Sequence, residues 1–426
     1  MALGGLLSIA GAGCSCSKSA GADGDPAPGA ADASASATAP AGPPASLDAL
    51  LLEGAPVITG ERGPAQPALR CSECHGPIHA DWSGSGHARS DTSPLYLAMR
   101  QHTPPAACDP CHAPLRSLTE PGDPVAAEGI TCDVCHTLRE VDLTGPRARL
   151  DFGLADNLRR GTLCDAQHHY FHKTMCSPLF RESQLCAGCH RWSLRPPVGR
   201  LIPVLTEYDE WSASPAAAAG TSCQGCHMPK REDEVATGWK RTALIGDHGM
   251  MNAGTMRRGA AAVRLLAEER HGALHAEVIL TNRGNGHRLP TGFPGRQLVL
   301  EVTALDAAGG EVAREVRTYA RVLVDAGGRE VPFYAAVAEA SDNRLAPGEA
   351  RRETFSFRAG VASALRARVL WRRLSPALAA ALGQPTPTEE RALAEARLRL
   401  SAASTASTAS TAPAAPAARP PRPSSP

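Results

Sequence analysis

CSECH, residues 71–75, is the first of five copies of the pattern C-x-x-C-H in this chain of 426 residues. The others are CDPCH at 108–112, CDVCH at 132–136, CAGCH at 186–190 and CQGCH at 223–227. Chance would give roughly 0.016 copies in a chain of this composition, so the repetition carries chemical meaning. The pattern is typical of covalent c-type haem attachment, in which two thiols three residues apart bond the two vinyl groups of one macrocycle. The sequence therefore predicts five c-type haems.

The motifs also assign the residues that hold these haems. The predicted thioether residues are Cys71, Cys74, Cys108, Cys111, Cys132, Cys135, Cys186, Cys189, Cys223 and Cys226. The histidine after each second cysteine is held beneath the iron and becomes its proximal ligand. These predicted proximal ligands are His75, His112, His136, His190 and His227.

Zinc is the main alternative, because pairs of C-x-x-C motifs build tetrahedral zinc sites. Three observations weigh against zinc. The number of motifs is odd, and a histidine follows the second cysteine of every motif. Ten of the 14 cysteines lie in these motifs, and the motifs are not spaced in pairs as the C-x-x-C motifs of zinc sites are. A redox dithiol would need only one such motif, within a βαβ pattern that this sequence lacks. The sequence favours haem over both.

The composition adds a reason for bound cofactors. Residues 47–258 are rich in Gly and Pro, and the whole chain has only 5 Trp, 5 Tyr and 7 Phe. Such a segment buries too little apolar surface to offset the entropy of ordering it, so large macrocycles would supply its core. The chain has 44 basic and 43 acidic residues and no basic run, which excludes a dedicated nucleic-acid binder.

Both ends of the chain look like segments outside the folded part. Residues 1–46 begin with a short apolar stretch, followed by Cys14 in a lipobox-like context and by an Ala/Pro/Gly/Ser tract. We expect an export signal and flexible linker there, with Cys14 a possible lipid tether; an ordinary cleaved signal behind a mis-assigned start is the alternative. Residues 401–426 are expected to be a disordered tail. The chain is expected to be extracytoplasmic, either periplasmic or an outer-membrane-associated lipoprotein.

The pattern of hydrophobic residues changes after Arg258. Residues 47–258 hold every motif and predict an irregular, mostly short-helical multihaem cytochrome c domain. Period-two alternation then appears in the stretches HAEVILTN, RQLVLEVTALD, TYARVLVD, RRETFSF and ALRARVLWRRL, separated by Gly-containing turns. This alternation predicts an antiparallel β-sandwich domain over residues 259–400, with residues 389–400 as a terminal amphipathic helix. The expected fold class is therefore mixed.

Two cysteines outside the motifs flank a histidine-rich loop. Cys164 and Cys176 lie on either side of His168, His169 and His172. In an oxidising compartment they could form a disulfide that pins the loop. Two free thiols are the alternative, and the sequence alone does not decide between them.

Seven stretches together carry a resemblance to a known family. They are CSECHGPIHADWSGSGHARSDTSPLYLAMR, CDPCHAP, EGITCDVCHTL, HKTMCSPLFRESQLCAGCH, TEYDEWSASP, CQGCHMP and NGHRLPTGFPGR. From Cys71 to about Gly383 the chain resembles the multihaem c-type cytochromes related to the tetrahaem cytochrome of ammonia-oxidising bacteria. These proteins are electron carriers, and the resemblance implies electron transfer here.

The resemblance also implies distal iron ligands at His87, His172 and His248. His287 and His102 complete the five distal candidates, with His168 and His169 as rivals for His102. His79 lies where the family commonly has tyrosine, so it is interpreted as a non-ligand. His287 would donate from the second domain; the alternative is a turn residue held by its Gly and Pro neighbours.

The expected function is electron transfer between extracytoplasmic redox proteins through five mostly bis-His haems. The rival is an enzyme that reduces a small nitrogen or sulfur species at one five-coordinate haem. The resemblance keeps this rival open, since the tetrahaem relative has one such iron. No motif carries Lys in place of His, as the pentahaem nitrite reductases do, so a carrier is favoured over a catalyst.

Overall fold

The computed structural model describes residues 51, 54–194, 200–238, 240–250, 259–400 and, by backbone alone, 407–410. The predicted export segment with Cys14 lies outside the described residues, as does the expected domain boundary near Arg258. No helix within the described ranges is long and apolar enough to cross a membrane.

The helices before residue 250 are all short, the longest having eight residues. They are α2 (Ala68–Ser72), α3 (Gly76–Ser83), α4 (Pro94–Arg100), α5 (Pro105–His112), α6 (Cys132–His136), α7 (Gln184–Ala187), α8 (Glu207–Ser212), α9 (Pro215–Ala218) and α10 (Cys223–His227). Proline occupies the first turn of α3, α4, α5 and α9, a position where its missing N–H costs nothing. Recurring proline therefore starts many of these helices.

Small sheets join these helices, and their strands were not predicted from the sequence. Their strands are β1 (Val57–Gly60), β2 (Leu138–Asp142), β3 (Arg149–Phe152), β4 (Leu158–Gly161), β5 (Lys173–Cys176), β6 (Trp192–Leu194), β7 (Ile202–Leu205), β8 (Lys230–Glu234) and β9 (Thr242–Gly246). The first three form one sheet in the order β1-β3-β2, and the others pair as β4-β5, β6-β7 and β8-β9. Parallel β4 and β5 hold one end of the histidine-rich loop.

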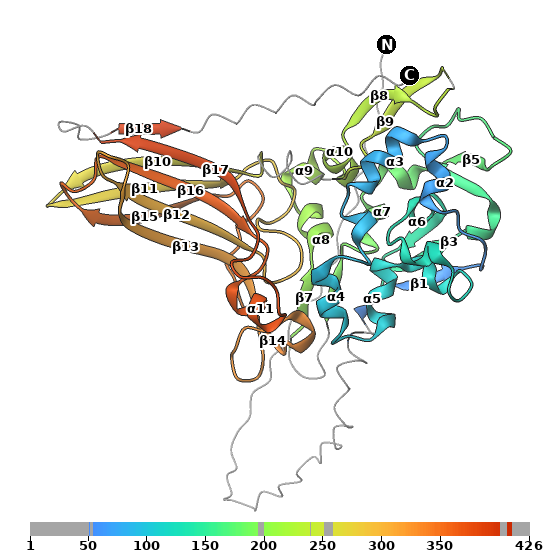
Figure 1. The fold of residues 1–426 in the computed structure, drawn as a ribbon, viewed down its shortest axis with the longest axis horizontal. Coiled ribbons are helices and arrows are strands. Elements are labelled where there is room, and N and C mark those ends of the chain that lie inside the picture. The colour runs from blue at the N-terminus through green and yellow to red at the C-terminus, as the bar shows by residue number, and fades with distance from the viewer. Residues whose placement is uncertain are drawn as a thin grey trace, which may run out of the picture. The chain divides into compact units, whose positions relative to one another are not determined.

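Long strands dominate the chain after residue 260 and are grouped together in Figure 1. They are β10 (Ala261–Arg270), β11 (Ala273–Asn282), β12 (Gln297–Leu305), β13 (Glu311–Val324), β14 (Ala338–Asp342), β15 (Ala350–Arg358), β16 (Ala364–Arg372), β17 (Glu390–Arg399) and β18 (Ser407–Ser410), with helix α11 (Pro376–Ala381) between β16 and β17. A strand forms at each of the five stretches where alternation predicted one. Strand β10 was not predicted.

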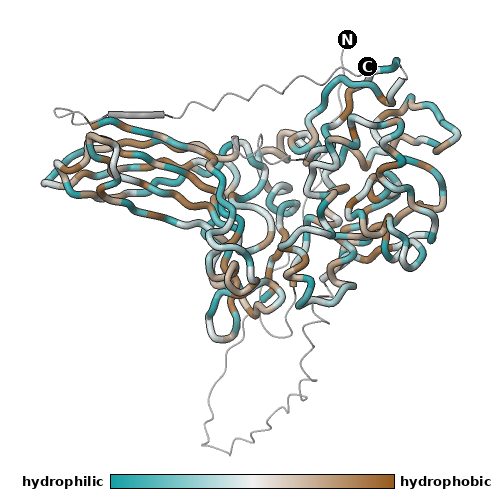
Figure 2. The backbone as a smooth tube through the Cα atoms, viewed as in Figure 1, coloured by the Kyte–Doolittle hydropathy of each residue, from teal (hydrophilic) through white to brown (hydrophobic). Residues whose placement is uncertain are grey.

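These strands form two antiparallel sheets, ordered β15-β11-β10-β18 and β14-β13-β12-β16-β17. Burial alternates strictly along β11, and Figure 2 shows the matching alternation of hydropathy along the long strands. Val278 of the first sheet and Leu300 and Leu365 of the second are fully buried in one shared core. We propose that this pair of sheets is the expected β-sandwich, since two sheets that bury facing side chains are its defining feature.

The terminal helix expected over residues 389–400 is replaced by strand β17, which pairs with β16. Its Ala, Leu, Glu and Arg residues favour a helix in isolation. In the folded chain, however, Leu393, Ala396 and Leu398 are buried against the shared core, and the edge of β16 supplies hydrogen-bond partners. Tertiary pairing thus overrides local propensity. Within the predicted disordered tail, Ser407–Ser410 form β18 against β10; residues 401–406 and 411–426 lie outside the described residues.

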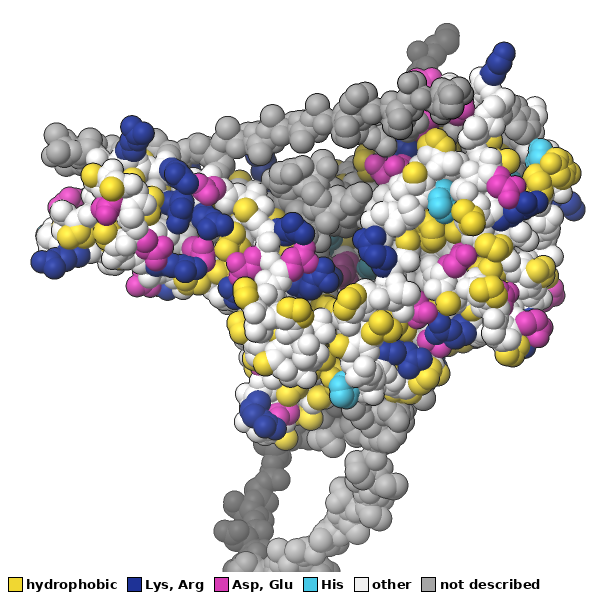
Figure 3. All heavy atoms as spheres, in the orientation of Figure 1, with side chains coloured by type: hydrophobic (Ala, Val, Ile, Leu, Met, Phe, Trp, Pro, Cys, Tyr) yellow, Lys and Arg dark blue, Asp and Glu magenta, His cyan; other side chains and the backbone are white. Residues whose placement is uncertain are grey.

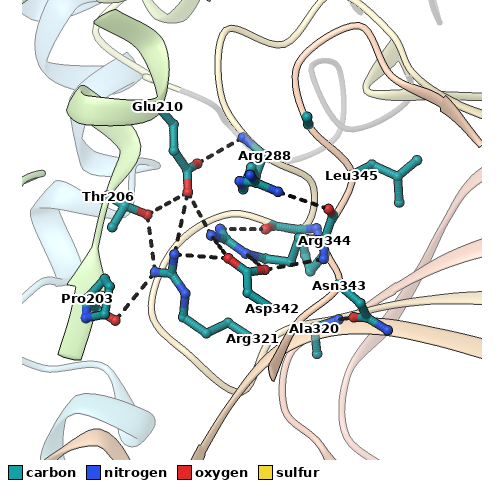
Figure 4. Close-up of polar contacts among 12 residues, drawn as sticks. Pro203, Thr206, Glu210, Arg288, Ala320, Arg321, Asp342, Asn343, Arg344 and Leu345 are labelled. Atoms are coloured by element: carbon teal, nitrogen blue, oxygen red, sulfur yellow. Dashed lines mark hydrogen bonds and ion pairs between the residues drawn. The ribbon is translucent and has the colours of Figure 1, made fainter. Parts of the chain in front are cut away.

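A buried charged network connects the helical half of the chain, residues 54–250, to the strand half, residues 259–400 (Figure 4). Glu210 of α8 accepts a hydrogen bond from Arg344 at 2.7 Å, and both Arg344 and Arg321 pair with Asp342 at the end of β14. Burial acts to raise the pKa of Asp342, but hydrogen bonds to Arg344 and the two arginine charges outweigh it and lower the pKa to about 2. Asp342 therefore stays ionised at neutral pH.

Candidate functional site

One helical turn carries each C-x-x-C-H motif, and this local geometry gathers its three reactive side chains. In the first motif the His75 N–H donates to the Cys71 carbonyl at 2.8 Å, and in the fourth the His190 N–H donates to the Cys186 carbonyl at 3.0 Å. Residues three and four apart share one face of a helical turn. The two thiols and the imidazole of a motif therefore lie on the same side of the backbone.

All five motifs face one cavity of about 2240 Å³. Its lining includes the five motif histidines and every motif cysteine except Cys108. None of the ten motif cysteines forms a disulfide in the described part of the chain. A cavity of this size exceeds the ordinary range for a single small ligand, roughly 300–1,000 Å³. Its volume and its thiols together suit several large cofactors.

Four motif histidines each face a second histidine across a fixed gap. The ring centres are 6.4 Å apart for His75 and His172, 6.4 Å for His190 and His87, 6.2 Å for His136 and His248, and 6.1 Å for His227 and His287. An imidazole nitrogen lies about 2 Å from a metal that it binds and roughly 1.2 Å from its own ring centre, so two imidazoles across one metal have centres roughly 6.4 Å apart. Each pair therefore has the spacing of two axial ligands of one iron.

Five of the eight imidazoles in these pairs, and that of His112, are also oriented for metal binding. The Nδ1–H of six histidines donates to a backbone carbonyl: His75 to Val235 at 2.8 Å, His112 to Ser90 at 2.7 Å, His136 to Arg160 at 2.6 Å, His172 to Lys173 at 3.2 Å, His248 to Gly246 at 2.8 Å and His287 to Arg288 at 3.3 Å. Such a bond fixes the tautomer and leaves the Nε2 lone pair for a metal. The residues present thus fit c-type haem.

Burial keeps three of these histidines in the neutral form that binds metals. Burial, together with the charges of neighbouring histidines, lowers the pKa of His87, His136 and His227 to about 4. A protonated imidazole has no lone pair for iron, so neutrality at physiological pH is a requirement for a ligand. These three histidines meet that requirement before any metal is bound.

His112 differs from the other four motif histidines. Among the described ring contacts it faces no second histidine; its ring instead lies 4.2 Å from the Tyr96 ring, with the planes 24° apart. Two rings this close must overlap face to face, because van der Waals contact holds edge-to-edge rings farther apart. Tyr96 therefore stacks on the face of the imidazole ring and does not lie opposite its Nε2 atom.

The structure does not bring His102 to His112, although His102 was the fifth distal candidate. Helix α4 ends at Arg100, and His102 follows as an exposed residue stacked on Tyr334 at 5.4 Å, away from the cavity. We therefore withdraw His102 from the ligand set. Of its rivals, His168 accepts a hydrogen bond from the Thr174 N–H, and the His169 ring lies 4.1 Å from the Tyr170 ring with the planes tilted by 40°.

Thiols of different motifs lie within hydrogen-bonding reach of each other. Cys71 reaches Cys132, Cys111 reaches Cys189, and Cys186 reaches Cys223. The attachment sites are therefore immediate neighbours along the wall of one cavity. Groups bound to them would lie side by side. This order could not be predicted from the sequence, because the neighbouring motifs are not always consecutive in the chain.

Cys164 and Cys176 form a disulfide, which resolves the alternative left open by the sequence. The disulfide closes the loop that carries His172. Lys173, the next residue, donates its N–H to the Asn157 carbonyl at 2.9 Å. The loop is thus fixed at both ends of the segment that places His172 opposite His75.

We expect the double variant Cys164→Ser, Cys176→Ser to bind the same number of haems but to hold His172 loosely. Closing a loop of this length contributes about 3 kcal/mol through the unfolded state. The variant should unfold at lower temperature and show partial high-spin character at one haem, as measured by electron paramagnetic resonance. His271→Ala, in the strand half, is the control. A variant with wild-type spin state and melting temperature would contradict this role of the disulfide.

Comparison with known proteins places the fold. The structure is similar to the crystal structure of a penta-heme cytochrome c552 from Thermochromatium tepidum, with a TM-score of 0.64 and 24% sequence identity over 79% of this chain and 99% of that chain. At this identity the likeness shows that the chain has the fold of a multihaem c-type cytochrome. No family model and no curated protein matches the chain.

Proposed function

We propose that the chain transfers electrons between extracytoplasmic redox partners through five covalently bound c-type haems, mostly with two histidine ligands. The observation that carries this proposal is the set of four imidazole pairs, each of which joins a motif histidine to a second histidine at the spacing of one iron. A haem supplies an iron that accepts and releases one electron. The ten motif cysteines would hold the five haems.

The arrangement of the motifs supports transfer from site to site. Cys71 beside Cys132 links the first motif to the third, Cys111 beside Cys189 links the second to the fourth, and Cys186 beside Cys223 links the fourth to the fifth. Two axial imidazoles leave an iron no open position for a substrate, so four of the five sites suit electron transfer rather than catalysis.

A reductase of a small nitrogen or sulfur species is the second candidate, and one observation favours it. The described residues place no histidine opposite His112, so its iron could keep an open position. Tyr96, on the flank of that imidazole, is almost fully buried, and burial raises its pKa to about 12. Its hydroxyl therefore stays protonated near this site. We rank the carrier first because the other four sites have closed ligand pairs.

The protein's compartment and partners are also part of the proposal. The disulfide between Cys164 and Cys176 supports an oxidising, extracytoplasmic compartment, either the periplasm or a lipoprotein tether through Cys14. Figure 3 shows basic and acidic side chains interspersed on the visible face, without a large basic patch. That distribution fits redox protein partners and gives no support to nucleic-acid binding.

The direct test is a haem count on the full chain produced with the haem-attachment machinery. Intact-mass spectrometry and a pyridine haemochrome assay should both give five haems per chain, and Cys223→Ala, Cys226→Ala should remove one. Cys164→Ser, Cys176→Ser is the matched control and should keep five, because those cysteines lie outside the motifs. A polypeptide without added porphyrin mass, or with zinc in its place, would refute the proposal.

A further inference from the structure

An acidic residue followed by tryptophan occurs beside two of the proposed haem sites. Asp81 and Trp82 lie on α3, and Glu210 and Trp211 lie on α8. The structure shows that both pairs make the same kind of contact with attachment motifs.

Each tryptophan holds the segment just before an attachment motif. The Trp211 indole N–H donates to the Thr221 carbonyl at 2.9 Å, and the Trp82 indole N–H donates to the Ile130 carbonyl at 2.8 Å. Thr221 and Ile130 each lie two residues before the first cysteine of a motif, Cys223 or Cys132. Each indole therefore fixes the start of the turn that carries a proximal histidine.

Glu210 holds the other imidazole of the same pair. Its carboxylate accepts a hydrogen bond from the backbone N–H of Arg288 at 2.9 Å, and Arg288 directly follows His287 (Figure 4). On the other side of His287, a Cβ atom at Gly286 would lie 2.9 Å from the Trp211 ring, so only glycine permits this close packing. The residues before and after His287 are thus both held by α8.

Buried partners keep the Glu210 carboxylate in this position. Its other oxygen accepts hydrogen bonds from Arg344 at 2.7 Å and from the Thr206 hydroxyl at 2.6 Å. Only 10% of the Glu210 side chain and 4% of the Arg344 side chain are exposed. Such a satisfied ionic cluster holds its members in one geometry.

Asp81 reaches the partner of the third motif through one arginine. It pairs with Arg231 of β8, which lies opposite Ile245 of β9, and β9 leads directly into His248. Arg231 also lies 3.7 Å from Asp247, the residue before His248. Trp82 therefore contacts the segment that leads into the third motif, and Asp81 reaches the segment that carries His248 through Arg231.

We infer that Glu210 and Trp211 are positioning residues that set both axial imidazoles of the fifth-motif iron, and that Asp81 and Trp82 do the same for the third-motif iron. This inference rests on the proposed function, since it concerns the ligands of haems bound there. It assigns the charged network between the two halves a role in haem ligation. His287 keeps the position of an iron ligand only while Glu210 accepts the hydrogen bond from the Arg288 N–H.

The test compares Glu210→Ala and Glu210→Gln with His287→Ala in the haem-loaded full chain. Electron paramagnetic resonance and visible spectra should show that Glu210→Ala converts at least half of one haem from low-spin to high-spin. The affected haem should be the one that His287→Ala converts completely. Glu210→Gln keeps an oxygen acceptor for the Arg288 N–H and should convert a smaller fraction of that haem to high-spin. This second variant provides the test if the alanine variant folds poorly.

Asp342→Asn is the matched control, because Asp342 belongs to the same network but does not contact Arg288. It should lower the melting temperature and leave all five haem spectra unchanged. If Glu210→Ala loses stability like Asp342→Asn but keeps the wild-type spectra, Glu210 is merely structural and the inference fails. If His287→Ala leaves the spectra unchanged, His287 is not an iron ligand and the inference about Glu210 fails. A haem count of five would still support the proposed function. A wild-type chain without haem would instead refute the proposed function itself.

Asp81→Ala tests the second copy independently of the first. It should alter the haem that His248→Ala alters, and leave the haem affected by Glu210→Ala unchanged. Alteration of the same haem by both acidic variants would contradict the assignment of one pair to each iron.

Discussion

Produced without attached haem, the chain should lack the fold of residues 54–250. An empty apolar cavity costs roughly 24 cal/mol per Å³, so a tenth of the 2240 Å³ left dry would cost about 5 kcal/mol. That cost equals the whole stability of a marginal domain, about 5–15 kcal/mol. The segment's own apolar core, around Leu115, Leu150 and Phe152, is small by comparison.

Hydrogen exchange of the haem-free and haem-loaded chains would measure this dependence. Amides of α6 and α10 should exchange without protection in the haem-free chain and slowly in the haem-loaded one. The strands β11, β12 and β16 are an internal control, because they bury a core of their own and should stay protected in both. Native-like protection of α6 and α10 without haem would show that the cofactors are not structural.

In the ferric protein we expect four low-spin haems and one haem of different ligation. The four imidazole pairs supply two strong axial ligands each, whereas His112 faces no second histidine among the described residues. Electron paramagnetic resonance should therefore resolve one high-spin centre. Added imidazole should convert that centre to low-spin and leave the other four unchanged.

Two variants make this expectation sharper. His87→Ala should create a second high-spin centre, because it removes the partner of His190. His102→Ala is the matched control and should leave the spectrum unchanged, since His102 is exposed beside Tyr334. Five low-spin centres in the unmodified protein would contradict the open position at His112 and would weaken the case for a reductase.

The single open site would also decide between the two candidate functions. A carrier should exchange electrons with redox proteins at rates that imidazole does not change. A reductase should consume a small nitrogen or sulfur species, and imidazole bound at the His112 iron should abolish that activity. Both outcomes are measurable on the same preparation.

The residues that attach haem could be predicted from the sequence, because that chemistry is local. Two thiols and an imidazole at positions one, four and five share one face of a single turn wherever that turn lies. The period-two strands were predictable for the same reason, since alternation records which side chains face a core. Residues 389–400 show where such reasoning fails: their local propensity favours a helix, and the edge of β16 made them a strand.

Tertiary structure alone decided which histidine faces which motif. His172 lies in a disulfide-closed loop, His248 follows a β-hairpin, and His287 lies between strands β11 and β12. No local sequence pattern records the contacts of these residues with their partners. His102 was the fifth candidate from the sequence, and in the structure it follows the end of α4 as an exposed residue. A ligand pair depends on two distant backbone segments held to within fractions of an ångström, and that precision comes from packing and buried charges such as Glu210, which local sequence does not encode.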